Sequence, residues 1–231
     1  EVYNIYSRVG PAASSDPYQA LMQPLIATSY LLFDWLADNE WFGATQIIVG
    51  SASSKTGLGL CAFLAEQANR PYKVVGLTGS ANAAFVRELG FCDDVLTYEN
   101  VGELEQVDSV YVDMAGNANV KQALHARLDG VLKHSSAVGL SHWDQFAKPE
   151  RLAGPKPQFF FAPAQIAKRK ADWGKGVIEG KITEATAQIV ADAARWLKLQ
   201  THEGLEAALQ PFADLAEGRA DPQTGHIVRL S

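Results

Sequence analysis

Short apolar runs alternate with helical patterns through the middle of the chain. The runs are rich in Val, Ile and Leu, they lie roughly 25–35 residues apart, and each is bounded by Gly, Asn, Asp or Ser. They predict strands over residues 46–50, 73–77, 95–97, 109–113, 131–138 and from Gln158 to Ala162.

Between these runs the apolar positions recur with the period of a helix. Leu58, Cys61, Ala62 and Ala65 share one face of a helix predicted over 57–69. Two more helices are predicted over 81–89, which Gly90 ends, and over 120–128. Strands that alternate with helices form βαβ units with right-handed crossovers. The pattern therefore predicts an α/β fold of the Rossmann type, a doubly wound parallel sheet of about six strands.

The two ends of the chain have a different pattern. Residues 1–20 are rich in turns and predict an N-terminal arm, and Thr28 is the expected N-cap of an apolar helix over 29–38. The last seventy or so residues predict a helical extension, with helices over 183–199 and 203–217 and a closing strand over 226–230. We expect that strand to pair with residues 2–6. The domain boundaries predicted are 1–20, 21–162 and 163–231.

Composition and charge exclude some classes of protein. The chain has 231 residues, of which 47% are hydrophobic and 20% charged, and its formal net charge is −6. An acidic chain without a basic face is not expected to bind nucleic acid. The apolar stretch from Leu21 to Trp41 is interrupted by Gln23, Pro24 and Asp34, so it predicts neither a membrane span nor a signal peptide.

Two cysteines are too few for a disulfide framework or a zinc site. We therefore expect no metal cofactor and a reducing, cytoplasmic location. Cys61 falls within a predicted helix and Cys92 in a loop. Because the first residue is Glu1 rather than methionine, we expect that a segment upstream of this chain is missing.

The segment GSASSKTGLGL, residues 50–60, has the character of a phosphate-binding turn. A triphosphate-binding loop needs a glycine directly before its lysine, and here Ser54 precedes Lys55. A dinucleotide-binding turn needs a strand, a tight turn and a helix with a glycine where the two pack closely. Gly57 supplies that glycine, and at three-residue spacing before it stand Ser54 and Ser51. Serine is small, and its hydroxyl can donate to a phosphate oxygen, so the dinucleotide reading is favoured.

The second predicted strand supports this reading and indicates which cofactor binds. Proteins of this fold that prefer NAD carry a carboxylate at the end of that strand for the ribose 2′-hydroxyl. Here the strand runs into Thr78, Gly79 and Ser80. Neutral hydroxyls there leave room for a 2′-phosphate, which predicts NADP(H).

The segments QIIVGSASSKTGLGLCAFLAE and YKVVGLTGSANAAFVRELGFCDDVLTYEN together resemble the nucleotide-binding half of the medium-chain dehydrogenases/reductases. The likeness is greatest to the zinc-free, quinone-oxidoreductase-like branch. Within the superfamily, SASSKTG, VYVDMAGN and VGLSHW are most similar to an uncharacterised, dehydrogenase-like bacterial family. The resemblance covers about residues 20–231 and implies an NADP(H)-dependent oxidoreductase acting on a small carbonyl, enone or quinone.

The resemblance also assigns residues to three parts of a cofactor site. It places a group at the pyrophosphate, a group around the adenosine ribose and a group near the nicotinamide. The three groups are, in that order, Ser53, Ser54, Lys55 and Thr56; Thr78, Gly79, Ser80 and Tyr98; and Met114, Ala115, Val138 and Gly139. Ala83 stands where quinone reductases often carry a lysine for the 2′-phosphate, and Lys55 is a candidate to replace that charge.

The remaining expectations concern chemistry and assembly. Tyr30 and His142 are the candidate proton donors, and Asp113, at the end of the fourth strand, either caps the next turn or takes part in the chemistry. In the superfamily an N-terminal barrel-like domain carries most substrate-facing residues, and almost nothing here corresponds to it. The edge strand from Gln158 to Ala162 is the expected seam of a homodimer.

Two alternatives remain. A short-chain dehydrogenase is disfavoured, because that class needs a Tyr-x-x-x-Lys pair and none of the 7 tyrosines has a lysine four residues later. A non-catalytic NADP(H)-sensing or interaction module would explain both the serines in the turn and the missing substrate domain.

Overall fold

The computed structural model describes residues 11, 13–139 and 151–230. By its contacts the chain divides into two units. One comprises Ser29–Gln165, and the other comprises residues 1–28 together with Ile166–Ser231. The first unit holds the predicted nucleotide-binding segments and is described first.

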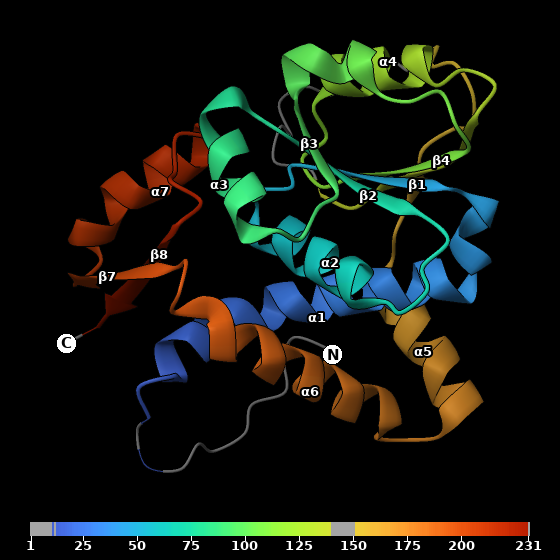
Figure 1. Cartoon of the computed structure of the whole chain (residues 1–231). Coiled ribbons are helices and arrows are strands. Elements are labelled where there is room, and N and C mark those ends of the chain that lie inside the picture. Colours follow the sequence, from blue (N-terminus) through green and yellow to red (C-terminus); the bar gives the residue numbers. More distant parts are fainter. Residues whose placement is uncertain (1–10, 12, 140–150, 231) are drawn as a thin grey trace. The chain divides into compact units, whose positions relative to one another are not determined.

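A six-stranded parallel sheet forms the centre of the first unit (Figure 1). Its strands lie in the order β3-β2-β1-β4-β5-β6. In chain order they are β1 (Gln46–Gly50), β2 (Lys73–Thr78), β3 (Asp94–Thr97), β4 (Ser109–Asp113), β5 (Leu132–Ala137) and β6 (Gln158–Phe159). This order confirms the predicted Rossmann-like fold, in which the direction of winding reverses between β1 and β4.

Helices cover both faces of this sheet (Figure 1). They are α2 (Lys55–Glu66), α3 (Ala83–Leu89) and α4 (Ala118–Arg127), with short 3-10 turns η1 (Glu40–Gly43), η2 (Ser80–Asn82) and η3 (Tyr98–Glu103) between elements. Ile48 and Tyr111 pack with Leu124 on the α4 face. Gly76 faces the other side, where a Cβ would lie 3.4 Å from Val86 of α3. Side chains that point alternately to the two faces of the buried strands therefore form the core on both sides of the sheet.

The predicted N-cap at Thr28 is wrong, because the first helix, α1, begins much earlier and spans Asp16–Asp38. Pro24 lies inside it and does not end it. The Thr28 hydroxyl donates to the Pro24 carbonyl, at 3.2 Å, one helical turn back. Met22 and Ile26, on either side of the proline, are both fully buried. Burial of this apolar face outweighs the cost of one missing backbone hydrogen bond.

The second unit contains helices and a small two-stranded sheet. Its elements are α5 (Ala162–Trp173), which begins in the first unit, α6 (Val177–Ala193), β7 (Lys198–Glu203), η4 (Glu206–Ala208), α7 (Leu209–Ala216) and β8 (Thr224–Arg229). β8 pairs in parallel with β7 over six residues. Residues 2–6, the partner expected for the closing strand, lie outside the described residues.

The predicted C-terminal helices are therefore wrong where they meet. The first was expected to continue to residue 199 and the second to begin at residue 203, and β7 occupies that junction. In the segment KLQTHE only Leu199 and His202 are half-buried and the other residues are exposed, and Gly204, at φ 80°, follows the strand. Its pairing with β8, more than twenty residues away, is a non-local contact that a short window of sequence does not reveal.

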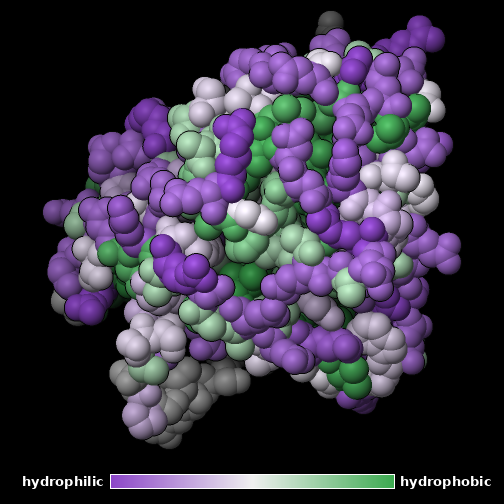
Figure 2. Space-filling model, viewed as in Figure 1, coloured by the Kyte–Doolittle hydropathy of each residue, from purple (hydrophilic) through white to green (hydrophobic). Residues whose placement is uncertain are grey.

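The surface is mostly polar in the view of Figure 2, with hydrophobic residues visible between the hydrophilic ones. None of the helices that the structure describes is long and apolar enough to cross a membrane.

Candidate functional site

Most residues predicted to hold a cofactor lie after the carboxyl ends of four strands. Because β1, β2, β4 and β5 are parallel, their carboxyl ends meet at one edge of the sheet. Strand β1 is paired with both β2 and β4, so the turn after β1 lies at the reversal of winding. Ligands of open α/β sheets bind in the crevice at this position.

The turn from β1 into α2 is tight and is fixed by its own backbone. Ser51 has φ 50°, in the left-handed region that glycine usually fills. The Ser54 amide donates to the Ser51 carbonyl at 2.8 Å, and the Ser54 hydroxyl accepts from the Gly57 amide at 3.1 Å. A Cβ on Gly57 would lie 2.6 Å from the Ser51 carbonyl oxygen. Gly57 is therefore required for helix and turn to approach this closely.

The start of α2 presents amides that an anion can use. Among the described residues, none accepts a hydrogen bond from the backbone amides of Ser53 and Thr56. The first turn of α2 carries no acidic side chain. The partial positive charge of a helix N-terminus favours a phosphate at such a position.

The serine hydroxyls of this turn also hold the fold together. The Ser53 hydroxyl accepts from the Thr78 hydroxyl at 2.9 Å and from the Asn82 amide at 3.4 Å. Thr78 is fully buried and Ser53 nearly so, which ties the turn after β1 to the end of β2. The Ser53 hydroxyl has accepted two hydrogen bonds and keeps its own proton to donate. The Thr78 side chain donates to Ser53, so the more accessible positions at this strand end are Gly79, which is half-buried, and Ser80, which is exposed.

Tyr98 joins the same group of residues. Its hydroxyl lies 3.0 Å from the Ser51 hydroxyl, and its ring passes 3.9 Å from the position of a Cβ on Gly79. Burial raises the pKa of Tyr98, and the hydrogen bond with Ser51 opposes that rise. The phenol therefore stays protonated at neutral pH and can donate a hydrogen bond.

On the other side of β1, the ends of β4 and β5 form a second part of the edge. Asp113 accepts from the amides of Ala115 and Gly116 at 3.2 and 2.9 Å, so its side chain caps the turn after β4. Its carbonyl accepts from the Val138 amide at 2.9 Å. A Cβ on Gly139 would collide with the carbonyl oxygen of Met114. The fold therefore brings together the two segments that were predicted to approach the nicotinamide.

Of the two candidate proton donors, only Tyr30 lies within the described residues. Tyr30 lies in α1, with its ring 5.7 Å from that of Phe63 in an edge-to-face contact. The neighbouring Ser29 donates to the Thr56 carbonyl at 2.7 Å, which fixes this part of α1 against the first turn of α2. His142 lies outside the described residues. Lys55 is the first residue of α2 and is half-buried.

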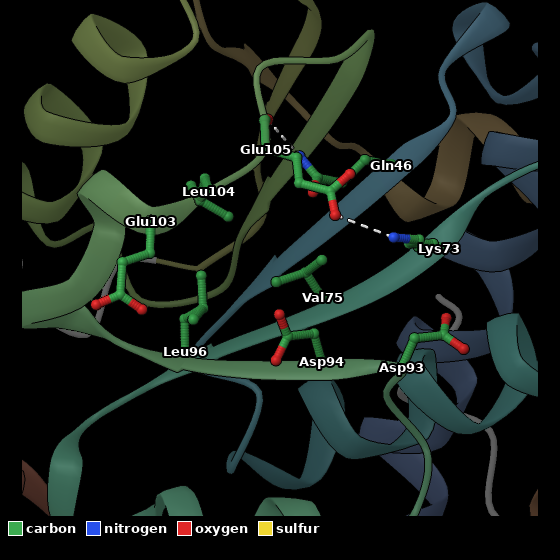
Figure 3. Close-up of a pocket in the computed structure, with 9 residues that line it drawn as sticks. All are labelled: Gln46, Lys73, Val75, Asp93, Asp94, Leu96, Glu103, Leu104 and Glu105. Atoms are coloured by element: carbon green, nitrogen blue, oxygen red, sulfur yellow. Dashed lines mark hydrogen bonds and ion pairs between the residues drawn. The ribbon is translucent and has the colours of Figure 1, made fainter.

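A hollow of about 240 Å³, which was not predicted from the sequence, lies at the opposite edge of the sheet (Figure 3). It is lined by Gln46, Lys73, Val75, Asp93, Asp94, Leu96, Glu103, Leu104 and Glu105. These residues include the starts of β1, β2 and β3, whereas the predicted cofactor residues follow strand ends. Lys73 is paired with Glu105 at 3.0 Å, and the other charged residues of the lining are acidic. The hollow is therefore unsuited to an anionic ligand.

The residues assigned to the cofactor site from the sequence did not include Ser51 and Asn82, although both hold the carboxyl edge of the sheet together. Asn82 bonds to Ser53, and Ser51 supplies both the left-handed turn and the contact with Tyr98. The three-residue spacing of Ser51, Ser54 and Gly57 was a usable signal for Ser51. No signal in the sequence identified Asn82, because its contact spans 29 positions.

The fold and this edge define a Rossmann-like α/β protein with a candidate nucleotide site. Residues 1–221 match the model of a family described as "Protein of unknown function (DUF2855)", and the chain belongs to that family. No curated protein matches the sequence. Among the described residues no group of three or more His, Cys, Asp or Glu side chains could hold a metal ion.

Solved structures with the same fold include several oxidoreductases. CurA of Vibrio vulnificus, crystallised with NADPH, superposes with a TM-score of 0.67 at 18% identity over 96% of this chain and 67% of its own. The yhdH oxidoreductase of Salmonella enterica, in complex with NADP, gives a TM-score of 0.57 at 17% identity over 97% of this chain and 66% of its own. A candidate NADPH:quinone reductase of Mesorhizobium loti gives 0.61 at 14% identity over 96% and 62%. The chain thus spans about two thirds of the length of these proteins.

Proposed function

We propose that this chain binds NADP(H) at the carboxyl edge of the sheet and is the cofactor-binding part of a zinc-independent oxidoreductase. The observation that carries the proposal is the turn from β1 into α2. It combines a left-handed Ser51, a Gly57 that permits no side chain and two amides without a protein acceptor in the described residues. A tight turn that leads into a helix N-terminus with free amides supports binding of the pyrophosphate of a dinucleotide.

The residues present fit such a cofactor in three places. The pyrophosphate would be held by the segment Ser53, Ser54, Lys55 and Thr56, with its amides and the positive end of α2. The adenosine ribose would lie against Gly79, Ser80 and the Tyr98 phenol, beside the buried Thr78. Met114 and Ala115 after β4, with Val138 and Gly139 after β5, would border the nicotinamide.

The choice of NADP(H) over NAD(H) follows from the end of β2. No carboxylate follows this strand before α3, since residues 79–82 are Gly, Ser, Ala and Asn. A 2′-phosphate would therefore meet neutral groups and no repulsion there. Two of the three solved structures named above were crystallised with NADPH or NADP, which supports the same choice.

The bound nicotinamide would supply hydride chemistry, and the chain would supply binding, orientation and a proton. Small carbonyl, enone or quinone compounds are the substrates proposed, and the Mesorhizobium loti neighbour supports the quinone. Tyr30, held near the first turn of α2 by Ser29, and His142 are the proposed proton donors. Capping by Asp113 would keep the turn after β4 in one conformation while a substrate is bound.

A non-catalytic NADP(H)-sensing module is the second candidate function. It is favoured by Ser51 and Ser54, which stand in the turn after β1 where dinucleotide-binding turns usually carry glycine. Steady-state oxidation of NADPH in the presence of quinones and aldehydes separates the two functions, because a sensor would bind the cofactor without turnover.

Calorimetric titration with NADPH and NADH tests the cofactor site. We expect NADPH to bind more tightly than NADH. Ser80→Asp should weaken NADPH binding by at least about tenfold, or ~1.4 kcal/mol, through repulsion of the 2′-phosphate, and should leave NADH binding nearly unchanged. Ser80→Asn is the matched control, since it has the size of Asp without the charge, and it should retain the preference for NADPH.

Equal affinity for the two cofactors, unchanged in Ser80→Asp, would refute the assignment of the adenosine site. If neither NADPH nor NADH binds, the proposed function as a whole is refuted.

A further inference from the structure

The last helix of the second unit carries its large apolar side chains on the outside. Leu205, Leu209, Phe212 and Leu215 are each between 67 and 70% exposed. The backbone is helical at Leu205 and continues through η4 into α7, so spacings of four, three and three residues place the four side chains on one face. None of the residues of α7, all of which the structure describes, is buried. These four residues are called the α7 stripe below.

The opposite side of the same helix presents small and polar residues to its own unit. Ala208, Pro211 and Asp214 recur every three residues and are half-buried. A helix on the surface of a globular protein normally turns its large apolar residues inward and its polar residues outward. Here the arrangement is reversed, so burial within this unit does not explain the α7 stripe.

Asp214 fixes the polar side of α7 to the chain that follows it. Its carboxylate accepts from Arg219 at 2.8 Å and from Gln210 at 3.0 Å. Its carbonyl accepts from the amides of Arg219 and Ala220 at 2.7 and 3.1 Å. The hydrogen bond from Arg219 lowers the pKa of Asp214, and the charge of His226 on β8 acts in the same direction. The carboxylate is therefore ionised at neutral pH, and it holds α7 with the stripe turned outward.

The charges around the α7 stripe are mainly acidic. Residues 203–230 contain five carboxylates, two arginines and no lysine. Both arginines already pair with carboxylates, Arg219 with Asp214 and Glu217, and Arg229 with Glu203 at 3.6 Å. Glu206 and Glu217, at the two ends of the helical segment, are exposed. The stripe is therefore an apolar surface with acidic ends.

This charge pattern distinguishes between possible occupants of the stripe. Amphipathic helices that bind anionic membranes carry Lys or Arg on the polar face, and an acidic helix would be repelled by such a surface. Two copies of the same face would likewise bring carboxylates against carboxylates. A surface with basic groups beside its apolar residues would meet opposite charge at both ends of the stripe.

We propose that the α7 stripe is the docking site for an amphipathic helix of a partner protein. The apolar side of that helix would cover Leu205, Leu209, Phe212 and Leu215, and its Lys or Arg side chains would lie near Glu206 and Glu217. The stripe spans ten residues, or about 15 Å of helix, which suits pairing with another helix of about three turns. The proposal does not depend on the cofactor site, since it concerns only the second unit.

Binding of a defined peptide tests the proposal on the whole chain. The probe is a fluorescein-labelled peptide of Leu and Lys, about four turns long, with Leu at the positions that form one face of a helix. A peptide with Glu in place of every Lys is its matched control. By fluorescence anisotropy the Lys peptide should bind at least about tenfold more tightly than the Glu peptide. Hydrogen exchange with the Lys peptide bound should slow at the amides of residues 205–216 and stay unchanged in β6.

Variants with unchanged charge show whether the apolar stripe is the site. Leu209→Ser and Phe212→Ser should each weaken binding of the Lys peptide by at least about tenfold, because apolar contact is lost. Phe159→Ser is the matched control, since Phe159 is 66% exposed and lies on β6 in the first unit. It should leave the affinity for the peptide unchanged. Circular dichroism checks that each variant is folded.

Four results would overturn the proposal. The first is a Lys peptide that does not bind, and the second is equal binding to the wild type and to Phe212→Ser, which would show attraction by charge alone. The third is binding to vesicles of phosphatidylcholine and phosphatidylglycerol that Phe212→Ser abolishes, which would make a lipid surface the occupant. The fourth is self-association of the wild type that the same substitution abolishes, which would make a second copy of this chain the occupant.

Discussion

At the residue scale, His134 is a buried base whose Nε2 atom has no hydrogen-bond partner in the described part of the chain. Its ring stacks on Phe42 at 4.2 Å between centroids and meets Trp35 at 5.1 Å. Among the described residues none bonds to its Nε2 atom. Burial lowers the pKa of His134, because the charged form would lose its hydration among aromatic rings.

This environment makes stability depend on pH. The pKa of His134 in the folded protein is below its ordinary value of about 6.5, so the unfolded chain binds the proton more readily. The free energy of unfolding is therefore greatest above about pH 6.5 and falls as the pH falls, by at most ~1.4 kcal/mol per pH unit for one proton. His125, whose pKa burial also lowers, contributes in the same direction.

We predict that His134→Phe reduces this pH dependence, because Phe fills the same aromatic contacts without a titrating group. At neutral pH the variant should be as stable as the wild type, or more so by about 1 kcal/mol, since an unpaired buried nitrogen is removed. Urea unfolding between about pH 5.5 and 7.5 measures both effects. An unchanged slope would assign the pH dependence to other groups.

At the scale of elements, the bond between Arg70 and Asp93 ties the start of β3 to β2. The guanidinium contacts both carboxylate oxygens, at 2.5 and 2.7 Å, and the carboxylate also accepts from the Val74 amide. Arg70 holds the pKa of Asp93 below its usual range. The contribution to stability is therefore present at neutral pH and is lost when the pH falls through the lowered pKa.

We predict that Arg70→Ala lowers the free energy of unfolding by about 1 kcal/mol, a value reduced for the partial exposure of both side chains. Lys73→Ala is the control, because Lys73 pairs with Glu105 on the surface and both are more than half exposed. This second variant should cause no measurable change. An equal loss of unfolding free energy in the two variants would contradict a larger contribution from the bidentate contact of Arg70 with Asp93. Urea denaturation at neutral pH compares them.

At the scale of the whole molecule, β6 is an edge strand with exposed aromatic side chains in it and directly after it. Phe159 is 66% exposed and Phe161 58% exposed, and β6 pairs only with β5 among the described strands. An unpaired strand edge with apolar neighbours is a surface suited to pairing with another chain. We propose that two copies of this protein form a homodimer through the segment from Gln158 to Ala162.

We predict that Phe161→Asp shifts the protein from dimer to monomer, as measured by light scattering after gel filtration. Phe212→Asp is the matched control, because Phe212 lies on α7 and is 70% exposed. It should leave the dimer intact. Dissociation by the α7 variant alone would move the interface from β6 to α7, and a monomeric wild type would refute the dimer.

Local patterns were enough to predict the sheet and the region of the candidate site. The bounds of β1 and β4 agree with the prediction, and Gly90 ends α3 as expected. Buried parallel strands are continuous apolar runs, and left-handed helix ends select glycine, so both features are visible within a few residues. The spacing of Ser51, Ser54 and Gly57 located the turn for the same reason.

The sequence by itself therefore determined the alternation of strands and helices, their order along the chain and the place of the tight turn between β1 and α2. Only the tertiary structure decided that α1 continues through Pro24 and that β7 replaces the end of a helix. Each of these outcomes depends on contacts between residues far apart in the chain. Such contacts decide between local alternatives of similar free energy, because burial against a distant element contributes more than local preference does.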